Sequence, residues 1–301
     1  MASRRFYSAL RQIKQWTAGL QGNEFNLETL RRTMNTSMMP VPETARLSRT
    51  EAGGVPCEWL RDPRGDSDRR LLYLHGGGYV AGGLASHRPL AAWIAGASGC
   101  SVLLADYRLA PEHVFPAAVE DALACFRWMA EHGPEAKGSA VKTVIAGDSA
   151  GGGLTLATLM ALREAGDELP AASVTLSAWT DLALTGGSLE SKAGVDPVVS
   201  PGMMRGLAAA YLGEADPRTS LASPLYGDLT GLPPLLIQVG EAEVLLDDSI
   251  RLAQRARNAG VQVSLEVWPE MFHVWQGFAP LFPEGQQAID RIGEFVRSFS
   301  L

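Results

Sequence analysis

A serine between two glycines is the residue of this sequence most suited to nucleophilic chemistry. Ser149 is the central residue of GDSAG, residues 147–151, and follows the apolar run Val144–Ala146. The apolar run is typical of a buried strand and Gly152–Arg163 is typical of a packed helix, so we expect the serine at a strand-to-helix turn. In such a tight turn, side chains two residues before and after the serine would collide with the strand and the helix, which explains the glycines. The segment therefore predicts that the Ser149 hydroxyl points into a cleft.

A run of three glycines upstream predicts the group that stabilises the negative charge of acyl transfer. The strand-like segment Arg70–Leu74 leads into HGGGY, residues 75–79. Attack of a serine on an acyl carbon forms a tetrahedral oxyanion, and glycines allow the backbone to turn N–H donors towards it. A flexible loop is the alternative for this run taken alone. A phosphate-binding loop fits less well, because no Gly-Lys-Ser/Thr follows and no Gly-x-Gly-x-x-Gly opens a helix.

Three ordered segments together resemble a known family. HGGGYV, DYRLAPEHVFPAAVED (Asp106–Asp121) and GDSAGG resemble the hormone-sensitive-lipase group of bacterial esterases, which have the α/β-hydrolase fold. The resemblance extends roughly from Val55 to the C-terminus. It implies that His75 is structural and that Asp148 binds backbone N–H groups instead of carrying protons. It also implies that the oxyanion hole consists of three backbone N–H groups, those of Gly77, Gly78 and Ala150.

A serine hydroxyl is a poor nucleophile until a base removes its proton, so the chain must also supply a histidine. Of its five histidines, His273 is the one we expect in this role. It stands in a loop after the strand-like segment Val263–Val267, and the α/β-hydrolase fold places its base after the nucleophile and the acid. A packed histidine between aromatic residues is the alternative. We expect His75 in the glycine loop, His87 at the start of a helix, His113 in the loop after Asp106 and His132 at the end of a helix.

The acid that orients the histidine is expected in the segment that follows the strand-like Leu235–Gly240. Related esterases have a pattern similar to Asp-Pro-Leu-x-Asp there, so the resemblance assigns the acid to Glu243, with Val244 in place of the proline. A glutamate can serve, because the role needs only an ionised carboxylate that faces the ring. Asp247 is the second candidate, although a carboxylate at a helix start also acts as a cap. Glu241 is the third candidate.

Composition favours one globular enzyme domain over residues 1–301 and argues against several kinds of partner. The chain is 46% hydrophobic and 20% charged, which is sufficient for a large core and too apolar for a disordered chain. Its formal charge of −7 comes from 33 acidic and 26 basic residues without a basic block. Nucleic acid and anionic membrane surfaces are therefore not expected partners, and a small-molecule ester is the expected substrate.

No cofactor, metal or membrane span is expected. The three cysteines, Cys57, Cys100 and Cys125, are widely spaced in apolar segments, which predicts buried thiols and not a disulfide framework. No Cys/His cluster has the spacing of metal ligands. Arg11 and Lys14 interrupt any apolar core of a signal peptide, and no apolar run approaches the length of a membrane span. These features predict a cytoplasmic enzyme.

Strand and helix patterns alternate along most of the chain, which predicts an α/β fold with a mostly parallel central sheet flanked by helices on both faces. The expected strands lie near Leu71–Leu74, Val102–Ala105, Thr143–Ala146, Ser173–Leu176, Leu235–Val239 and Val263–Val267. The expected helices lie near His87–Ser98, Ala117–Glu131, Gly152–Glu164, Asp248–Asn258 and Gln286–Phe299.

Two segments do not follow this alternation. Apolar residues recur at helical spacing between Phe6 and Leu20, and Leu182–Leu221 inserts a polar, glycine-rich stretch followed by a helix. In the related esterases such segments form a cap, so the resemblance implies a helical cap from about 1–40 and 182–221. We expect the N-terminal helix to pack on the insert; a simple surface helix is the alternative. If Val263–Val267 is an edge strand, its pairing with a second copy would give a homodimer.

Together these features predict a serine carboxylesterase of α/β-hydrolase fold that works through an acyl-enzyme intermediate. The resemblance implies that its substrates are short- to medium-chain acyl esters. An amide or thioester hydrolase of the same mechanism is the alternative within this class. A non-catalytic ligand-binding relative is the alternative outside it. The presence of Ser149, Glu243 and His273 in one chain argues against the second alternative.

Overall fold

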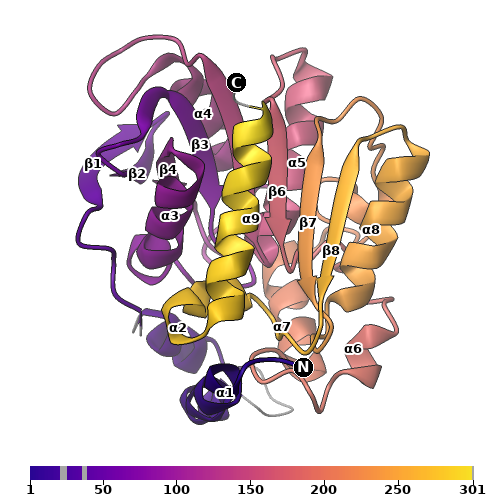
Figure 1. The fold of residues 1–301 in the computed structure, drawn as a ribbon. Coiled ribbons are helices and arrows are strands. Elements are labelled where there is room, and N and C mark those ends of the chain that lie inside the picture. The colour runs from indigo at the N-terminus through magenta and orange to yellow at the C-terminus, as the bar shows by residue number, and fades with distance from the viewer. Residues whose placement is uncertain (21–25, 36–38, 300–301) are drawn as a thin grey trace.

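The computed structural model describes residues 1–20, 26–35 and 39–299. These residues form one eight-stranded sheet with the strand order β1-β2-β4-β3-β5-β6-β7-β8 (Figure 1). β2 is antiparallel to both of its neighbours, and every pair from β4 to β8 is parallel. The strands are β1 (Arg46–Ala52), β2 (Val55–Arg61), β3 (Asp66–Leu74), β4 (Cys100–Ala105), β5 (Lys142–Asp148), β6 (Ala172–Leu176), β7 (Leu235–Gly240) and β8 (Val263–Trp268).

Helices cover both faces of the sheet. α3 and α9 pack side by side on one face, and α4, α5 and α8 pack on the other (Figure 1). The α-helices are α1 (Arg4–Trp16), α2 (Leu27–Asn35), α3 (Leu84–Ser98), α4 (Ala117–Glu131), α5 (Ala150–Ala165), α6 (Ser188–Ser191), α7 (Pro201–Leu212), α8 (Leu246–Asn258) and α9 (Pro283–Phe299). Short 3₁₀ helices are η1 (Ala18–Leu20), η2 (Pro224–Tyr226) and η3 (Trp275–Leu281). The expected fold class is thus confirmed.

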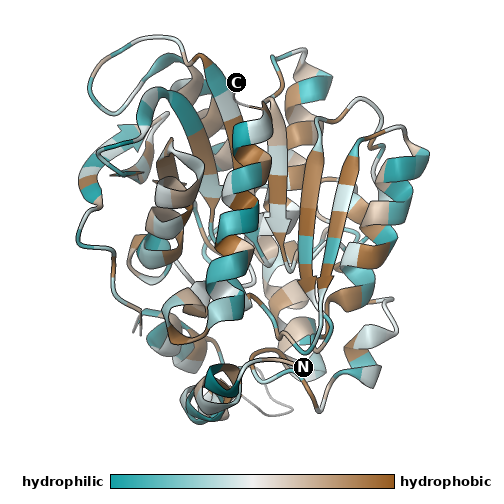
Figure 2. Ribbon diagram, viewed as in Figure 1, coloured by the Kyte–Doolittle hydropathy of each residue, from teal (hydrophilic) through white to brown (hydrophobic). Residues whose placement is uncertain are grey.

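Alternation of side chains along the strands creates the two core layers. In β3, Leu71 and Tyr73 lie in the layer with α3 and α9, whereas Leu72 and Leu74 lie in the layer with α4 and α5. All four are completely buried. Because the central strands are covered on both sides, they are almost uniformly apolar, while α9 shows polar residues on its outer side (Figure 2).

The sequence patterns located each expected strand but missed β1 and β2. β1 has the sequence RLSRTEA and most of its side chains are exposed or partly exposed, so it lacks the apolar alternation that identifies a strand. β2 contains Pro56, which weakens a strand prediction because proline cannot donate to a ladder. β1 is the edge strand of the sheet, where exposed side chains are tolerated, and Pro56 of β2 stands next to the first residue of its strand.

The N-terminal helix α1 packs on a different partner from the one expected. Its apolar face, with Phe6 and Ile13, contacts the segment around Phe272 and η3, next to the carboxyl end of β8. The insert is touched at its edge, where Thr17 Oγ1 donates to Pro197 O at 2.6 Å. The expectation that the insert is the main partner of α1 was therefore wrong, since Val198 is the one described residue of the insert in the apolar cluster that contains Phe6 and Ile13. Parts of the expected 1–40 cap segment, residues 21–25 and 36–38, lie outside the described residues.

Candidate active site

Ser149 lies at the sharp turn between β5 and α5, as the sequence predicts. Its backbone has φ 52° and ψ −120°, a conformation that L-residues rarely adopt. A Cβ atom at Gly147 would lie 2.2 Å from Gly151 O, and one at Gly151 would lie 2.0 Å from Leu74 O. Only glycine therefore fits at either position, and the turn depends on both.

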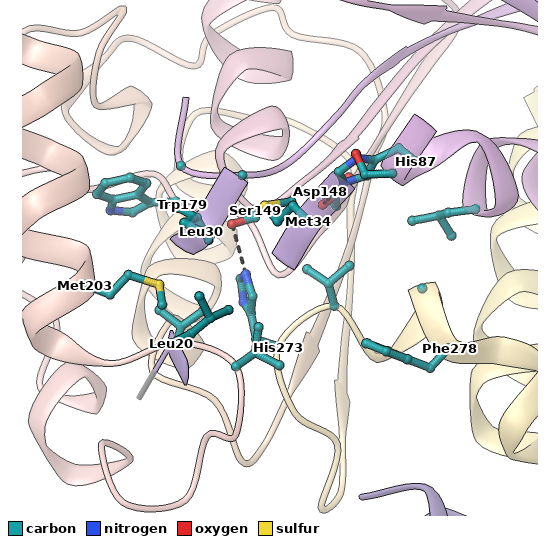
Figure 3. Close-up of a pocket in the computed structure, with 18 of the residues that line it drawn as sticks. Leu20, Leu30, Met34, His87, Asp148, Ser149, Trp179, Met203, His273 and Phe278 are labelled. Atoms are coloured by element: carbon teal, nitrogen blue, oxygen red, sulfur yellow. Dashed lines mark hydrogen bonds and ion pairs between the residues drawn. The ribbon is translucent and has the colours of Figure 1, made fainter. Parts of the chain in front are cut away.

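His273 and Glu243 continue from Ser149 as a hydrogen-bonded chain. His273 Nε2 lies 2.9 Å from Ser149 Oγ, as Figure 3 shows, and His273 Nδ1 lies 3.3 Å from Glu243 Oε1. With its proton on Nδ1, the ring donates to the carboxylate and presents Nε2 as the acceptor for the serine proton. The three residues follow the carboxyl ends of β5, β7 and β8, which lie at the same edge of the sheet.

Glu243 is completely buried and its second oxygen is fixed by two donors. The Ser177 hydroxyl donates to Glu243 Oε2 at 2.8 Å, and the Gly240 N–H donates to the same oxygen at 2.8 Å. Ser177 Oγ in turn accepts from Val274 N at 3.0 Å, so it connects the acid to the residue after His273. Oε1 is thereby held towards the histidine.

The other two candidate acids lie elsewhere. Asp247 Oδ2 accepts from Ser188 N at 2.9 Å, at the start of α6 in the insert. Glu241 is exposed and accepts from Glu270 N at 3.2 Å. Of the three candidates, the structure brings only Glu243 to His273.

The surroundings of His273 determine its basicity. Burial lowers the pKa of this histidine, but the hydrogen bond to Glu243 and the negative charges of Glu243, Asp196 and Asp148 outweigh that effect. The net result is a pKa above the usual 6.5. A base with a raised pKa accepts the serine proton more readily, provided that the ring starts neutral.

The glycine loop after β3 faces Ser149. Gly77 has φ +117° and Gly78 has φ +64°, both in the region that favours glycine. A Cβ at Gly77 would lie 2.2 Å from Ala81 O, so the loop has no room for a side chain there. Both glycines and Ser149 line one pocket. Ala150 is the first residue of α5, where N–H groups are not used by the helix itself.

Asp148 and His75 brace this loop, in agreement with their expected structural roles. Asp148 Oδ1 accepts from Gly76 N at 3.1 Å and from the Tyr73 hydroxyl at 2.8 Å. The His75 ring stacks on Tyr107 with a centroid distance of 4.2 Å. Burial lowers the pKa of His75 to about 3, so its ring is neutral at physiological pH.

Two polar residues of the site were not found from the sequence. His87 lines the pocket and its Nε2 lies 3.4 Å from Asp148 Oδ2, although the sequence suggested only a helix start. Ser177 follows β6 and contacts the acid. The available signal was positional, because Ser177 follows the carboxyl end of a strand just as Ser149 and Glu243 do.

The pocket above Ser149 is a cavity of about 170 Å³ with mostly apolar walls. Its walls come from the N-terminal helices, α3, the insert and η3, and Figure 3 shows several of the lining residues around Ser149 and His273. The apolar lining residues include Trp16, Leu20, Leu30, Met34, Val198, Met203, Leu207 and Phe278. Among the described residues, no group of three or more His, Cys, Asp or Glu side chains is placed to bind a metal. Within the same ranges, no helix combines the length and the hydrophobicity needed to cross a bilayer.

The fold and this site define an α/β hydrolase, and comparison with known proteins agrees. A family model described as "alpha/beta hydrolase fold" matches residues 71–277, and the chain belongs to that family. An acetyl-hydrolase of Streptomyces hygroscopicus is 49% identical over 247 residues, which are 82% of this chain and 81% of that protein. An esterase of Acinetobacter venetianus is 32% identical over 265 residues, 88% of this chain and 86% of that protein.

The relationship extends to a narrower group. The crystal structure of an esterase from the bacterial hormone-sensitive-lipase family superposes with a TM-score of 0.93 at 46% identity, and the match covers 100% of both chains. The chain is thus a member of the hormone-sensitive-lipase family of bacterial esterases, as its motifs indicated. It is an enzyme, a hydrolase of the carboxylesterase type.

Proposed function

We propose that Ser149 is the nucleophile, His273 the general base and acid, and Glu243 the orienting carboxylate of a carboxylesterase that acts on short- to medium-chain acyl esters. The observation that carries this proposal is the hydrogen-bonded chain from Ser149 Oγ to Glu243 Oε1 at the base of an apolar pocket. We further propose that the N–H groups of Gly77, Gly78 and Ala150 bind the oxyanion. This assignment is supported because both glycines line the same pocket as Ser149 and because Ala150 directly follows Ser149 in the sequence.

The proposed reaction has two halves. In the first, His273 Nε2 takes the Ser149 proton while Oγ forms a bond to the ester carbon, and the carbonyl π electrons move to oxygen. Collapse of this oxyanion breaks the bond to the alcohol, which leaves with the proton from His273. In the second half water takes the place of the serine, and the acid is released as Ser149 regains its proton. Each oxyanion donor contributes on the order of 10²–10³ in rate.

The size of the pocket supports the proposed length of the acyl chain. A cavity of roughly 150 Å³ accommodates a benzene-sized group, and the pocket here has about 170 Å³. An acyl chain of butyrate to hexanoate size fills such a volume, whereas a palmitoyl chain would have to extend beyond it. The apolar lining contributes about 0.8 kcal/mol for each buried CH₂ group, so affinity should rise with chain length until the cavity is full.

Three broader features belong to the same proposal. We propose that residues 1–40 and 182–221 form a cap, because residues from both segments line the pocket. A homodimer through β8 is supported by the position of that strand at the end of the sheet order, paired with β7. We also propose a cytoplasmic location, because the sequence has three widely spaced cysteines and no disulfide framework.

Initial rates on p-nitrophenyl esters from acetate to palmitate, for wild type and Ser149→Ala, test the proposal. We expect kcat/KM to rise from acetate to butyrate or hexanoate and to fall for longer chains. Ser149→Ala should lose roughly 10⁴-fold or more of the activity with its circular dichroism unchanged, because the hydroxyl lies in an open cleft. A variant that keeps more than about a tenth of wild-type turnover would refute the role of Ser149. Equal rates on the matching amides or thioesters would favour the alternative substrate classes.

A further inference from the structure

The insert contains a buried carboxylate, Asp196, that the proposed mechanism does not use. Asp196 is 3% exposed and lies between α6 and α7. Its Oδ1 accepts from Val198 N at 2.9 Å and from Val199 N at 3.2 Å, which closes a turn. Turn closure alone does not explain a buried charge, because exposed aspartates close the same kind of turn without the cost of desolvation. The second oxygen of the carboxylate shows where the group is directed.

Asp196 Oδ2 accepts from Val244 N at 3.1 Å. Val244 directly follows Glu243, so this bond fixes the peptide unit that joins the proposed acid to the next residue. Proline, the residue that the resemblance leads us to expect at position 244, has no N–H and could not make the contact. The insert makes a second hydrogen bond to the same residue, because the Ser188 hydroxyl donates to Val244 O at 2.7 Å.

The charge of Asp196 also acts on the histidine. Burial raises the pKa of Asp196 to about 6, with His273 lowering it and Glu243 raising it. Reciprocally, Asp196 contributes to the raised pKa of His273, together with Glu243 and Asp148. The other acids near this loop, Glu241 and Glu270, instead contact each other and, in the case of Glu270, Tyr7.

We propose that Asp196 is a positioning residue for ester hydrolysis: through Val244 N it fixes the backbone that carries Glu243, and its carboxylate adds negative charge beside the Glu243–His273 pair. The inference rests on the proposed function, since it acts through the acid and the base of that mechanism. It makes the insert part of the catalytic geometry as well as part of the pocket wall, because Val198 and Val199 of the same turn line the pocket.

Two substitutions separate the two effects. Asp196→Asn can keep the turn, with its oxygen accepting from Val198 and Val199, but it removes the charge and turns an N–H₂ group towards the Val244 N–H. Val244→Pro keeps the charge and removes the donor, and it also fixes φ at residue 244. Val244→Ala is its control, because it shortens the side chain but retains the N–H. Asp216→Asn is the control for Asp196, since Asp216 Oδ1 accepts from Arg218 N in an exposed turn of the same insert.

The measurements are kcat and KM on p-nitrophenyl butyrate and the pH profile of kcat/KM. We expect kcat to fall about tenfold in both Asp196→Asn and Val244→Pro, the effect of one lost orienting hydrogen bond, with KM changed by less than about threefold. The acid limb of the profile should move to lower pH in Asp196→Asn and stay in place in Val244→Pro. Both controls should keep the wild-type kcat to within about threefold and the wild-type limb.

Several results would overturn the inference. An unshifted acid limb in a folded Asp196→Asn variant would exclude the electrostatic effect, and a wild-type kcat in Val244→Pro would exclude the positioning effect. If Asp196→Asn does not fold, the two Val244 variants still decide whether the contact orients the acid. Glu243→Gln is measured in the same series. A wild-type kcat in Glu243→Gln would refute the proposed acid itself. A large loss of kcat in Glu243→Gln, together with a wild-type kcat in the Asp196 and Val244 variants, would refute this inference alone.

Discussion

Glu243→Gln exchanges one carboxylate oxygen for an N–H₂ group, and the contacts of Glu243 determine which one. Oε2 accepts from the Gly240 N–H and from the Ser177 hydroxyl. The Gly240 N–H is part of the backbone and cannot turn away, so the remaining oxygen of the amide must stay on that side. The N–H₂ group then faces His273 Nδ1 and forces this nitrogen to be an acceptor. With the ring proton on Nε2, His273 cannot take the proton of Ser149.

The expected loss follows from this wrong tautomer. Exchanging the orienting acid for its amide costs on the order of 10²–10⁴ in kcat, which corresponds to about 3–5 kcal/mol of transition-state stabilisation. Asp247→Asn is the matched variant, with the same chemical change four residues further along the chain. Because Asp247 accepts from Ser188 N and does not contact the histidine, its amide should keep kcat to within about threefold and cost about 1 kcal/mol of stability.

The assay is kcat on p-nitrophenyl butyrate for both variants, combined with urea unfolding followed by circular dichroism. A Glu243→Gln enzyme with kcat within about threefold of wild type would refute the tautomer argument. A large loss in Asp247→Asn, with a small one in Glu243→Gln, would move the acid to Asp247. Comparable partial losses in the two variants would mean that the second carboxylate supports the first.

The site gives four further predictions. His273 must be neutral to act as a base, so activity is lost as the pH falls through its raised pKa, and the acid limb of kcat/KM should have its midpoint above pH 6.5. Gly77→Ala should lower kcat by about 10²–10³ with little change in KM, because a Cβ there would lie 2.2 Å from a backbone oxygen and would displace the loop; unchanged kcat would exclude Gly77 from the oxyanion hole. Phe6→Ala should cost about 3 kcal/mol in urea unfolding and also lower kcat, because Phe6 stacks on Phe272 beside the histidine. Deletion of Met1–Met38 should give a chain that folds poorly or hydrolyses acetate and butyrate esters far less well, although an organophosphate should still label Ser149; an unchanged kcat/KM and acyl preference would show that these helices are mere surface.

The three proposed catalytic residues could be selected from the sequence because each of them follows a parallel strand. Ser149, Glu243 and His273 come after β5, β7 and β8, and the carboxyl ends of parallel strands lie at one edge of a sheet. Local patterns suffice for such a prediction, since β5 and β7 are marked by apolar runs and β8 by apolar residues that alternate with polar ones, and the proposed catalytic residue follows within a few positions. The glycines of residues 147–151 are equally local, because their role is to avoid backbone that is close in sequence or on the neighbouring strand.

Contacts between distant segments were not predictable in the same way. The apolar spacing of α1 identifies which face is buried, but any apolar surface could cover it, and the actual partner is formed by residues far along the chain near Phe272. Asp196 gave no signal, because an aspartate before a proline reads as an ordinary turn residue. Its direction towards Val244 depends on how the insert folds back on the end of β7, which no local pattern contains.

The attachment of the pocket walls to the loops of His273 and Glu243 has a consequence for engineering by recombination. Part of the pocket wall comes from α1, α2 and the insert, which lie before β1 and between β6 and β7 in the sequence. These segments are therefore candidates for grafting from a relative in order to exchange substrate preference. Yet α1 is anchored to the loop of His273 through Tyr7 and Glu270, and the insert is anchored to the loop of Glu243 through Ser188 and Asp196. A chimera that changes the wall without its matching anchor would gain a new specificity and lose turnover, so the two must be transplanted as one unit.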